Sequence, residues 1–407
     1  MPRAWLLCCA VGFAPAAYAQ PLTYTDAVAR AGVDGPTIAA SDAAVEAARL
    51  SIRPAGRLPD PELALGLDNV PVSGADRYRL DRDEMTMQRI GIMQEVPSGA
   101  VRRARTGAAE AASDRAVADS DIARLQARLG AARAWIAQHY ALQRQTVLQQ
   151  SEGDARALAG AARARLAAGG SADDALTSAI EAARAADRLS AAGAAIIAAR
   201  AELRRWAGDA AIDGVAGAEP VFSIDPMRLR EHLARHPDII AFDAAVRAAS
   251  AEIDIARAET HPDWTWEVAY QHRDRDFGDM ASVGVRIGLP LFGRQRPVIE
   301  ARRADLTRAG AERDALLREH QALLETRLAS YASLAASLSR AQTTTLPLAR
   351  QRQAATQAAH AAGGADLVQA IGARRDARDA ELEAIDMAER LATLSAELTL
   401  EYGDAAP

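Results

Sequence analysis

The chain has 407 residues, with 48 Lys and Arg against 54 Asp and Glu and a formal net charge of −6. This mildly acidic balance argues against a general nucleic-acid-binding protein, which needs a basic surface. Aromatic residues make up only 4% of the chain, charged residues make up 25%, and alanine occurs in long runs. Because alanine forms helices readily but buries little surface, the composition favours an elongated helical protein over a compact enzyme with an aromatic core.

The N-terminus has the pattern of a secretory signal peptide, which we predict for residues 1–19. Arg3 precedes an apolar stretch, and the small-residue cleavage site is Ala17–Ala19. Both cysteines, Cys8 and Cys9, lie inside this segment, so the mature chain would be exported and free of disulfides, thiol catalysis and cysteine metal sites. No later apolar run approaches the ~20 residues of a spanning helix, so any membrane role must depend on strands.

The rest of the sequence repeats itself once. When Pro36 is aligned with Pro237, nine of fourteen positions are identical between residues 36–49 and 237–250. Later strings recur in the same order in both halves, namely IGIMQEVP and VGVRIGLP, AAGG and AAGG, and AELRRWAG and AELTLEYG. We therefore predict two structural repeats, each with a helix, a β-hairpin, a very long helix, a glycine turn and a returning helix. The predicted boundaries are 20–215 and 216–407 for the repeats, about 61–97 and 262–290 for the hairpins, and 169–171 and 363–365 for the turns.

The second hairpin has the clearest strands, because apolar and polar residues alternate along both of them. The apolar positions, which we predict to face lipid, are Trp264, Trp266, Val268, Tyr270, Val283, Val285, Ile287 and Leu289. Strands with one apolar face and one polar or small face are typical of transmembrane β-hairpins. The alternative is an amphipathic hairpin covering a soluble core. The export signal and the lack of other strands to cover the apolar face favour the membrane.

The first hairpin carries a weaker form of the same pattern. Leu63, Leu65 and Leu67 alternate with polar and small residues, but the stretch from Met85 to Val96 changes phase midway. A β-bulge is one explanation for this change. Two hairpins supply four strands, which are too few to close a barrel, so the sequence predicts an oligomer.

Each hairpin is followed by an exceptionally long helix. The chain has no proline from about Ser98 to Ala168, and only Pro347 interrupts the stretch from Val298 to Ala362. Roughly 65–70 residues at 1.5 Å each correspond to on the order of 100 Å of helix. Patches of heptad spacing indicate coiled-coil packing. The first helix of the second repeat is predicted from Pro226 to Ala258.

The sequence lacks the signatures of an enzyme. It has no nucleophile elbow, no phosphate-binding loop and no dinucleotide fingerprint, so we expect no catalytic site and no cofactor. His232 and His236 have the spacing of a helical metal pair, but no third ligand is close in the sequence and Pro237 follows. We therefore predict no metal site.

The order of these elements resembles the TolC family of outer-membrane efflux proteins over nearly the whole mature chain. The residues that carry the resemblance are PDPELALGLDNVPV (59–72), MQRIGIMQEVPSGAVRRAR (87–105), VGVRIGLPLFGRQRP (283–297) and AAGGADLVQAIGARR (361–375). The first two strings are most similar to the heavy-metal-efflux branch. The implied fold is mainly α with membrane β: a homotrimer with a twelve-stranded barrel in the outer membrane, four strands from each protomer, and a coiled-coil tunnel in the periplasm.

The resemblance also implies partners and site residues. The tunnel tips would contact a periplasmic adaptor (a membrane fusion protein) coupled to an inner-membrane RND-type pump; no nucleic-acid partner is implied. The tip residues would be Gly169, Gly170, Ser171, Gly363 and Gly364. At the family's inner gate this chain has Gln369 and Gly372, so that gate is not carried over. Nearby candidate pore-gate acids are Asp366, Asp376 and Asp379, for which a solvated helix face is the alternative.

The function that the resemblance implies is a passive outer-membrane conduit that exports small solutes, most favourably heavy-metal cations, from the periplasm or cytoplasm to the exterior. Multidrug efflux and type I secretion are alternatives within the same class. A periplasmic coiled-coil adaptor or structural protein is the alternative of another class. An adaptor would lack lipid-facing strands, and Trp264 and Trp266 argue against it. A structural protein would leave the duplicated hairpins unexplained.

Overall fold

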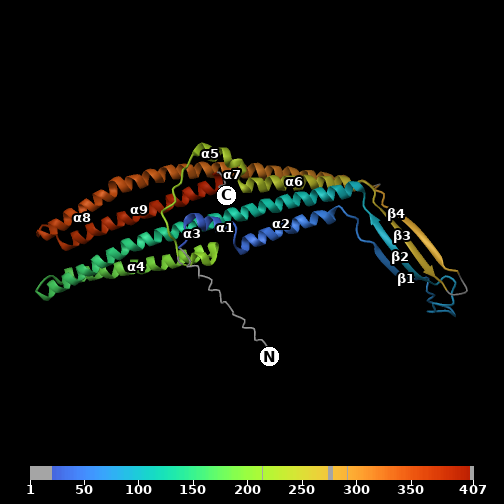
Figure 1. Ribbon diagram of the computed structural model, residues 1–407, viewed down its shortest axis with the longest axis horizontal. Helices are drawn as coiled ribbons and strands as arrows, with labels where there is room; N and C mark the ends of the chain where they lie inside the picture. The colour runs from blue at the N-terminus through green and yellow to red at the C-terminus, as the bar shows by residue number, and fades with distance from the viewer. Residues whose placement is uncertain (1–20, 213, 274–277, 291, 404–407) are drawn as a thin grey trace, which may run out of the picture.

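The computed structural model describes residues 21–212, 214–273, 278–290 and 292–403 of the chain. The molecule is elongated, with a β-sheet at one end and long helices over the rest of its length (Figure 1). The predicted signal peptide lies outside the described residues. Among the residues that the structure describes, no helix is both long and apolar enough to cross a membrane.

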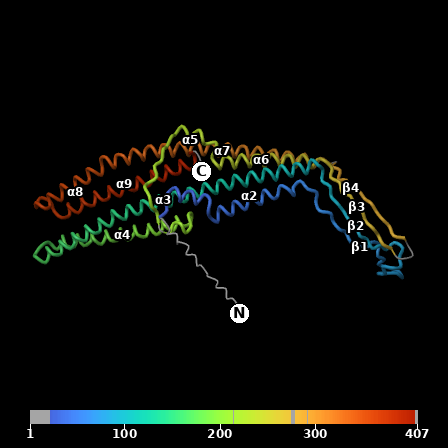
Figure 2. The backbone as a smooth tube through the Cα atoms, in the orientation of Figure 1, coloured from blue at the N-terminus to red at the C-terminus, as the bar shows by residue number. Residues whose placement is uncertain are grey.

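The helices follow the same order in both halves of the chain. The first half contains α1 (Tyr24–Ala31), α2 (Pro36–Ala55), α3 (Gly99–Ala167), α4 (Ala172–Ala207) and the 3₁₀ turn η1 (Gly208–Ala211). The second half contains α5 (Pro226–His232), the 3₁₀ turn η2 (Leu233–Arg235), α6 (Pro237–Ala258), α7 (Gln295–Arg340), the π turn η3 (Ala341–Thr345), α8 (Leu346–Ala361) and α9 (Leu367–Tyr402). The α3 helix packs on α2, α4, α6 and α9, so it is the central rod of the molecule. Figure 2 shows its uninterrupted course.

Two predicted helices are interrupted at prolines. The helix predicted from Pro226 to Ala258 breaks before Pro237, because a residue that precedes proline avoids helical backbone angles. His236 is accordingly extended, with φ −59° and ψ 133°, and its side chain caps the new helix α6 by accepting from the Asp238 backbone N–H. The helix that contains Pro347 passes through η3 just before the proline. The wider turn accommodates a residue without an N–H donor.

Close packing of the helices depends on small residues. The main core joins α1, α3, α4 and α9 around Trp135, which is fully buried and donates from Nε1 to the Leu22 carbonyl at 2.7 Å. Gly130 of α3 lies against the indole of Trp206, and a Cβ at this position would come within 2.3 Å of the ring. Glycine at this position therefore permits the close approach of α3 and α4.

The sheet has four antiparallel strands in the order β1-β2-β3-β4. They are β1 (Glu62–Asp68), β2 (Met87–Val96), β3 (Trp264–His272) and β4 (Met280–Ile287). The central pair, β2 and β3, joins the two halves of the chain, with Val96 opposite Trp264. The register of each pair is continuous, so the bulge offered for the phase change in β2 is wrong.

The phase change reflects two polar residues of β2 on the apolar face, Gln88 and Gln94, while Met87 and Met93 lie on the opposite face. Gln94 lies on the same face as Ile90 and Ile92 and pairs with Trp266. Its amide nitrogen donates to the Pro59 carbonyl at 2.7 Å and to the Glu95 carbonyl at 2.8 Å. The amide is therefore satisfied by backbone at the helical end of the sheet, where a polar side chain is tolerated.

The junction between sheet and helices is built on hydrogen bonds as well as on proline. Pro97 is fully buried between β2 and α3. The next residue, Ser98, caps α3 by accepting from the Val101 backbone N–H at 3.2 Å. The Ser98 backbone N–H donates to Asp263 Oδ1 at 2.7 Å, which ties the start of α3 to the start of β3.

Candidate functional site

The two faces of the sheet differ sharply in chemistry. Because the strands are in continuous register, side chains line up in rows across the sheet. The rows on one face are Leu63–Ile92–Val268–Val283, Leu65–Ile90–Tyr270–Ala281 and Val96–Trp264–Ile287. The rows on the other face are Glu62–Met93–Glu267–Gly284, Ala64–Gly91–Ala269–Ser282, Gly66–Arg89–Gln271–Met280 and Glu95–Thr265–Arg286. One face is therefore apolar, and the other is charged or small.

Seven of the eight residues predicted to face lipid share the apolar face. Their strand positions follow from the two-residue period of β3 and β4. Val283 and Val285 are 76% and 61% exposed, and Trp266 is half-buried. The eighth, Leu289, lies beyond the end of β4 and is 63% exposed. A continuous exposed apolar surface of this kind requires a lipid or protein partner.

The opposite face combines small residues with ion pairs. Arg89 of β2 pairs with Glu267 of β3 across the strands. Gly91 lies directly opposite Ala269, where a Cβ on residue 91 would approach the alanine Cβ to 3.0 Å. Small side chains and paired charges make this face polar with few protruding side chains, which suits the inner wall of a water-filled barrel.

Both edges of the sheet are open. The strand order places β1 at one edge and β4 at the other, and within the described residues no further strand pairs with either. Each edge carries N–H and C=O groups without ladder partners, which is costly in an apolar environment. The sheet is therefore incomplete as a single copy.

The two glycine turns lie at the end of the molecule farthest from the sheet (Figure 1). Gly169 has φ +92° and Gly363 has φ +77°, a region that favours glycine. Gly170 N donates to the Arg165 carbonyl at 2.8 Å, and Gly364 N donates to the Ala359 carbonyl at 2.8 Å. Both helices thus end in the same Schellman turn, and the structure brings the predicted tip glycines to one end.

The residues after the glycines begin the returning helices. Ser171 Oγ accepts from the Asp174 backbone N–H at 3.3 Å and caps α4. Asp366 Oδ1 accepts from the Gln369 backbone N–H at 2.7 Å and caps α9. Capping accounts for both residue types at these positions.

The other two candidate gate acids are paired within the chain. Asp376 of α9 accepts from Arg352 of α8 at 2.8 Å. Asp379 lies 3.8 Å from Arg188 of α4, which links the two helical hairpins. The three predicted acids therefore have three different partners rather than a shared site.

A set of ion pairs that the sequence did not reveal ties α3 to α9. Arg144 Nη1 lies 2.9 Å from Asp386 Oδ1 and also contacts Glu389. Nearer the tip, Arg378 Nη2 lies 3.5 Å from Asp154 Oδ2. The paired residues are more than 200 positions apart in the chain, so no local pattern marks them. These contacts hold the two helical hairpins together between the core and the tips.

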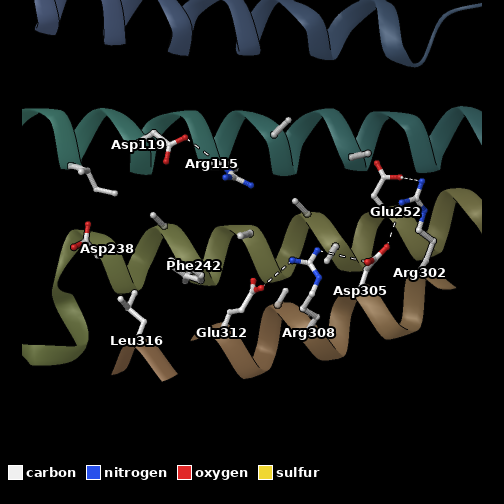
Figure 3. Close-up of a pocket in the computed structure, with 18 residues that line it drawn as sticks. Arg115, Asp119, Asp238, Phe242, Glu252, Arg302, Asp305, Arg308, Glu312 and Leu316 are labelled. Carbon is white, nitrogen blue, oxygen red and sulfur yellow. Dashed lines mark hydrogen bonds and ion pairs between the residues drawn. The ribbon is translucent and has the colours of Figure 1, made fainter. Parts of the chain in front are cut away.

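A groove of about 770 Å³ runs along α6 between α3 and α7. Its floor is largely alanine, with Phe242 and Leu316, and charged side chains project above it (Figure 3). The charged residues are Arg115, Asp119, Asp238, Glu252, Arg302, Asp305, Arg308 and Glu312. Most of the charges are paired, as with Arg308 and Glu312 at 3.1 Å. Five carboxylates against three guanidiniums leave the groove net acidic.

At one end of this groove, a buried cluster joins α6, α7 and α9. His236 is 3% exposed and His320 is 7% exposed, and their ring centroids are 4.2 Å apart. Asp238 Oδ2 lies 3.4 Å from His320 Nε2 and 3.7 Å from His236 Nδ1. Burial, together with His320 and Arg327 and against the effect of Asp238, lowers the pKa of His236 to about 4. The sequence suggested His232 as the partner of His236, whereas the structure places Asp238 and His320 beside it.

Comparison with known proteins gives a family match to part of the chain and a shared fold over most of it. Residues 229–403 match the model of a family described as outer membrane efflux protein. The fold is similar to the CmeC outer membrane channel of Campylobacter jejuni, with a TM-score of 0.79 at 11% identity over 93% of this chain and 85% of that one. It is also similar to the outer membrane protein VceC of Vibrio cholerae, with a TM-score of 0.75 at 20% identity over 93% of this chain and 96% of that one. The similarity to CusC has a TM-score of 0.76 at 15% identity, over 93% of this chain and 92% of that one. No curated protein matches the sequence significantly.

The second half of the chain therefore matches the outer membrane efflux protein family, in agreement with the sequence resemblance. The predicted fold class, mainly helical with a four-stranded antiparallel sheet, is confirmed.

Proposed function

We propose that three copies of this chain close one twelve-stranded barrel in the outer membrane. The observation that carries the proposal is the four-stranded sheet with an apolar face and two open edges. If β1 of one protomer pairs with β4 of the next, every edge group gains a partner, and a ring of three closes without free edges. The apolar face then meets lipid through the residues from Trp264 to Tyr270 and from Val283 to Leu289.

The helices continue this barrel as a tunnel through the periplasm. α3, at 69 residues, spans roughly 100 Å at 1.5 Å per residue. The glycine turns at Gly169 and Gly363 form its far end, where they meet a periplasmic adaptor coupled to an inner-membrane RND-type pump. Both tips expose short turns of small residues, which a helical hairpin of an adaptor can approach closely.

Heavy-metal cations are the solutes that we propose for this conduit. The strings DPELALGLDNVPV and RIGIMQEVP are most similar to the heavy-metal-efflux branch. The chain has a net charge of −6, and the groove along α6 is net acidic. Acidic surfaces along a water-filled path concentrate cations and disfavour anions. Multidrug efflux and type I secretion are the competing assignments within the same class.

The barrel is tested by cross-linking between edge strands. The described chain from residue 21 onward contains no cysteine, so a Leu65→Cys/Val283→Cys variant has one thiol on β1 and one on β4. A short bis-thiol reagent should give covalent dimers and trimers in outer membranes, whereas either single-cysteine variant should stay monomeric on denaturing gels. If the double variant yields only monomers, the proposed pairing is refuted.

The cargo is tested by growth of a strain from which the gene is deleted. Restoring the gene should raise tolerance to copper, zinc, cobalt, nickel, silver or cadmium salts and leave tolerance to detergents and antibiotics unchanged. Rescue against detergents and antibiotics without rescue against any metal would refute the metal assignment while leaving the channel intact.

A further inference from the structure

The cluster of His236, Asp238 and His320 lies where three helices of the second half meet. His236 and Asp238 stand at the N-terminal end of α6, and His320 belongs to α7. Tyr402, the last residue of α9, completes the surroundings, with its hydroxyl 3.3 Å from His320 Nδ1. Within the described part of the chain, this is the one group of three His, Cys, Asp or Glu residues whose ligand atoms lie within 4.8 Å of one another.

The spacing of the ligand atoms fits a metal ion. Zinc–nitrogen and zinc–oxygen bonds are about 2.0–2.2 Å, so two ligands of a tetrahedral ion are about 3.4 Å apart. Asp238 Oδ2 is 3.4 Å from His320 Nε2 and 3.7 Å from His236 Nδ1. These separations are too long for strong hydrogen bonds but match the edges of a coordination tetrahedron. The three ligand atoms all lie within 4.8 Å of one another, so they must draw closer together to hold one ion.

The protonation of the ligands also fits. His236 Nδ1 accepts from the Asp238 backbone N–H at 3.2 Å, so its proton is on Nε2. An ion bound at Nδ1 would take the place of this long capping hydrogen bond, because an imidazole nitrogen has a single lone pair. When an ion binds His320 Nε2, the imidazole proton sits on Nδ1, where the Tyr402 hydroxyl oxygen accepts it. An outer hydrogen bond of this kind fixes the tautomer and orientation of a metal-binding histidine.

The surroundings provide charge balance and an entry path. Arg327, whose charge acts on His236, is paired with Glu401, which offsets its repulsion of a metal ion. Asp238 is 38% exposed and lines the acidic groove along α6, as Figure 3 shows, while both imidazoles are buried. An ion can therefore reach the buried ligands from the groove through the carboxylate.

We propose that His236, Asp238 and His320 bind one divalent transition-metal ion of the zinc class in each protomer, with water or another oxygen as the fourth ligand. Two imidazoles and one carboxylate are ligands that zinc, cobalt and nickel accept. The site ties the start of α6 to α7 directly and to α9 through Tyr402. This role is structural and does not depend on which solute the channel exports.

The test uses the purified full-length channel in detergent, stripped with a chelator and titrated with Zn²⁺ or Co²⁺. Wild-type protein should bind one ion per protomer, and Co²⁺ should develop the intense visible absorption of tetrahedral coordination. Asp238→Asn and His320→Gln, which keep the size of each side chain, should weaken binding by more than about tenfold. His261→Gln is the matched control, because the His261 ring contacts the Ala258 carbonyl and is not part of the cluster.

A separate variant distinguishes metal binding from misfolding. Tyr402→Phe keeps the aromatic ring and all three ligands but removes the outer hydrogen bond, so it should still bind Co²⁺, with affinity reduced by about tenfold or more. Equal affinity and stoichiometry in wild type and in a His236→Gln/His320→Gln variant that assembles normally would overturn the proposal. Wild-type protein that binds no ion at micromolar metal would also overturn it.

Discussion

A substitution of Val285 by arginine tests the membrane orientation of the sheet. Val285 lies in the middle of β4 on the apolar face, pairs with Trp266 of β3 and is 61% exposed. Its neighbour Gly284 points to the polar face, and a Cβ added there would meet no atom within 4 Å. The variants Val285→Arg and Gly284→Arg therefore place the same charge at adjacent positions on opposite faces.

The expected magnitudes differ because only one arginine meets lipid. An arginine on the lipid face near the bilayer midplane costs about 2–4 kcal/mol, which corresponds to about a 30- to 1,000-fold shift in the folding equilibrium of each protomer. In a trimer the cost is incurred three times, or about 6–12 kcal/mol. The arginine at position 284 faces water beside Glu267 and should cost close to nothing.

The assay is refolding into lipid vesicles across a urea series, followed by the trimer band on unheated gels. Val285→Arg should lower the urea midpoint and the yield of trimer, and Gly284→Arg should match wild type. If Val285→Arg assembles as well as wild type, or if both variants fail equally, the assignment of the two faces is wrong.

Three further predictions concern the helical region. Changing Gly169 and Gly363 to valine forces a positive φ on a branched residue, at a cost of about 1–2 kcal/mol each. The double variant should abolish efflux without lowering the yield of trimer. Normal efflux in cells would discard the tip assignment. Arg144→Gln leaves two carboxylates of α9 without their cation and should raise conductance in planar bilayers, and unchanged conductance would show that this tie does not restrain the tunnel. Gly130→Ala should destabilise the protein by about 1–3 kcal/mol, because the added methyl group meets an indole ring. Gly160 has open space around it and should tolerate alanine. The melting temperatures of the two variants measure the difference. Equal melting temperatures for these two variants would contradict the packing argument.

The strands of the second hairpin could be predicted because their signal is local. Side chains alternate between faces every two residues, so the run from Trp264 to Tyr270 assigns its own faces without knowledge of any partner strand. The pairing of Val96 with Trp264 is different in kind, because it joins segments from the two halves of the chain. Likewise, the position of Gln94 on the apolar face has a reason that only the fold reveals, since its amide donates to the distant Pro59 carbonyl.

The ion pairs between the helical hairpins could not be predicted for a related reason. Arg144 and Asp386 stand on helices where charged residues are common, and nothing in the local spacing distinguishes a bridging pair from a solvated one. Their meeting depends on how α3 and α9 pack side by side. Asp366, near the second tip, is a different case. The sequence suggested it as a pore residue, whereas in the structure it caps a helix.

The proposed metal site lies where the two halves of the chain differ. In the alignment that places Pro36 on Pro237, His236 corresponds to Gly35 and Asp238 corresponds to Thr37. When Pro97 is aligned with Pro290, the two prolines that follow the strands, Ala127 corresponds to His320. None of these three counterparts can bind a transition metal.

The first half instead fills the corresponding place with an apolar cluster of Ala31, Ile38, Ala127 and Ala131. That cluster excludes water and needs no ion to hold α2 against α3. The second half places two buried imidazoles and a partly exposed carboxylate at its own helix junction, where they can share one cation. The departure from the repeat, rather than the repeat itself, therefore points to the site.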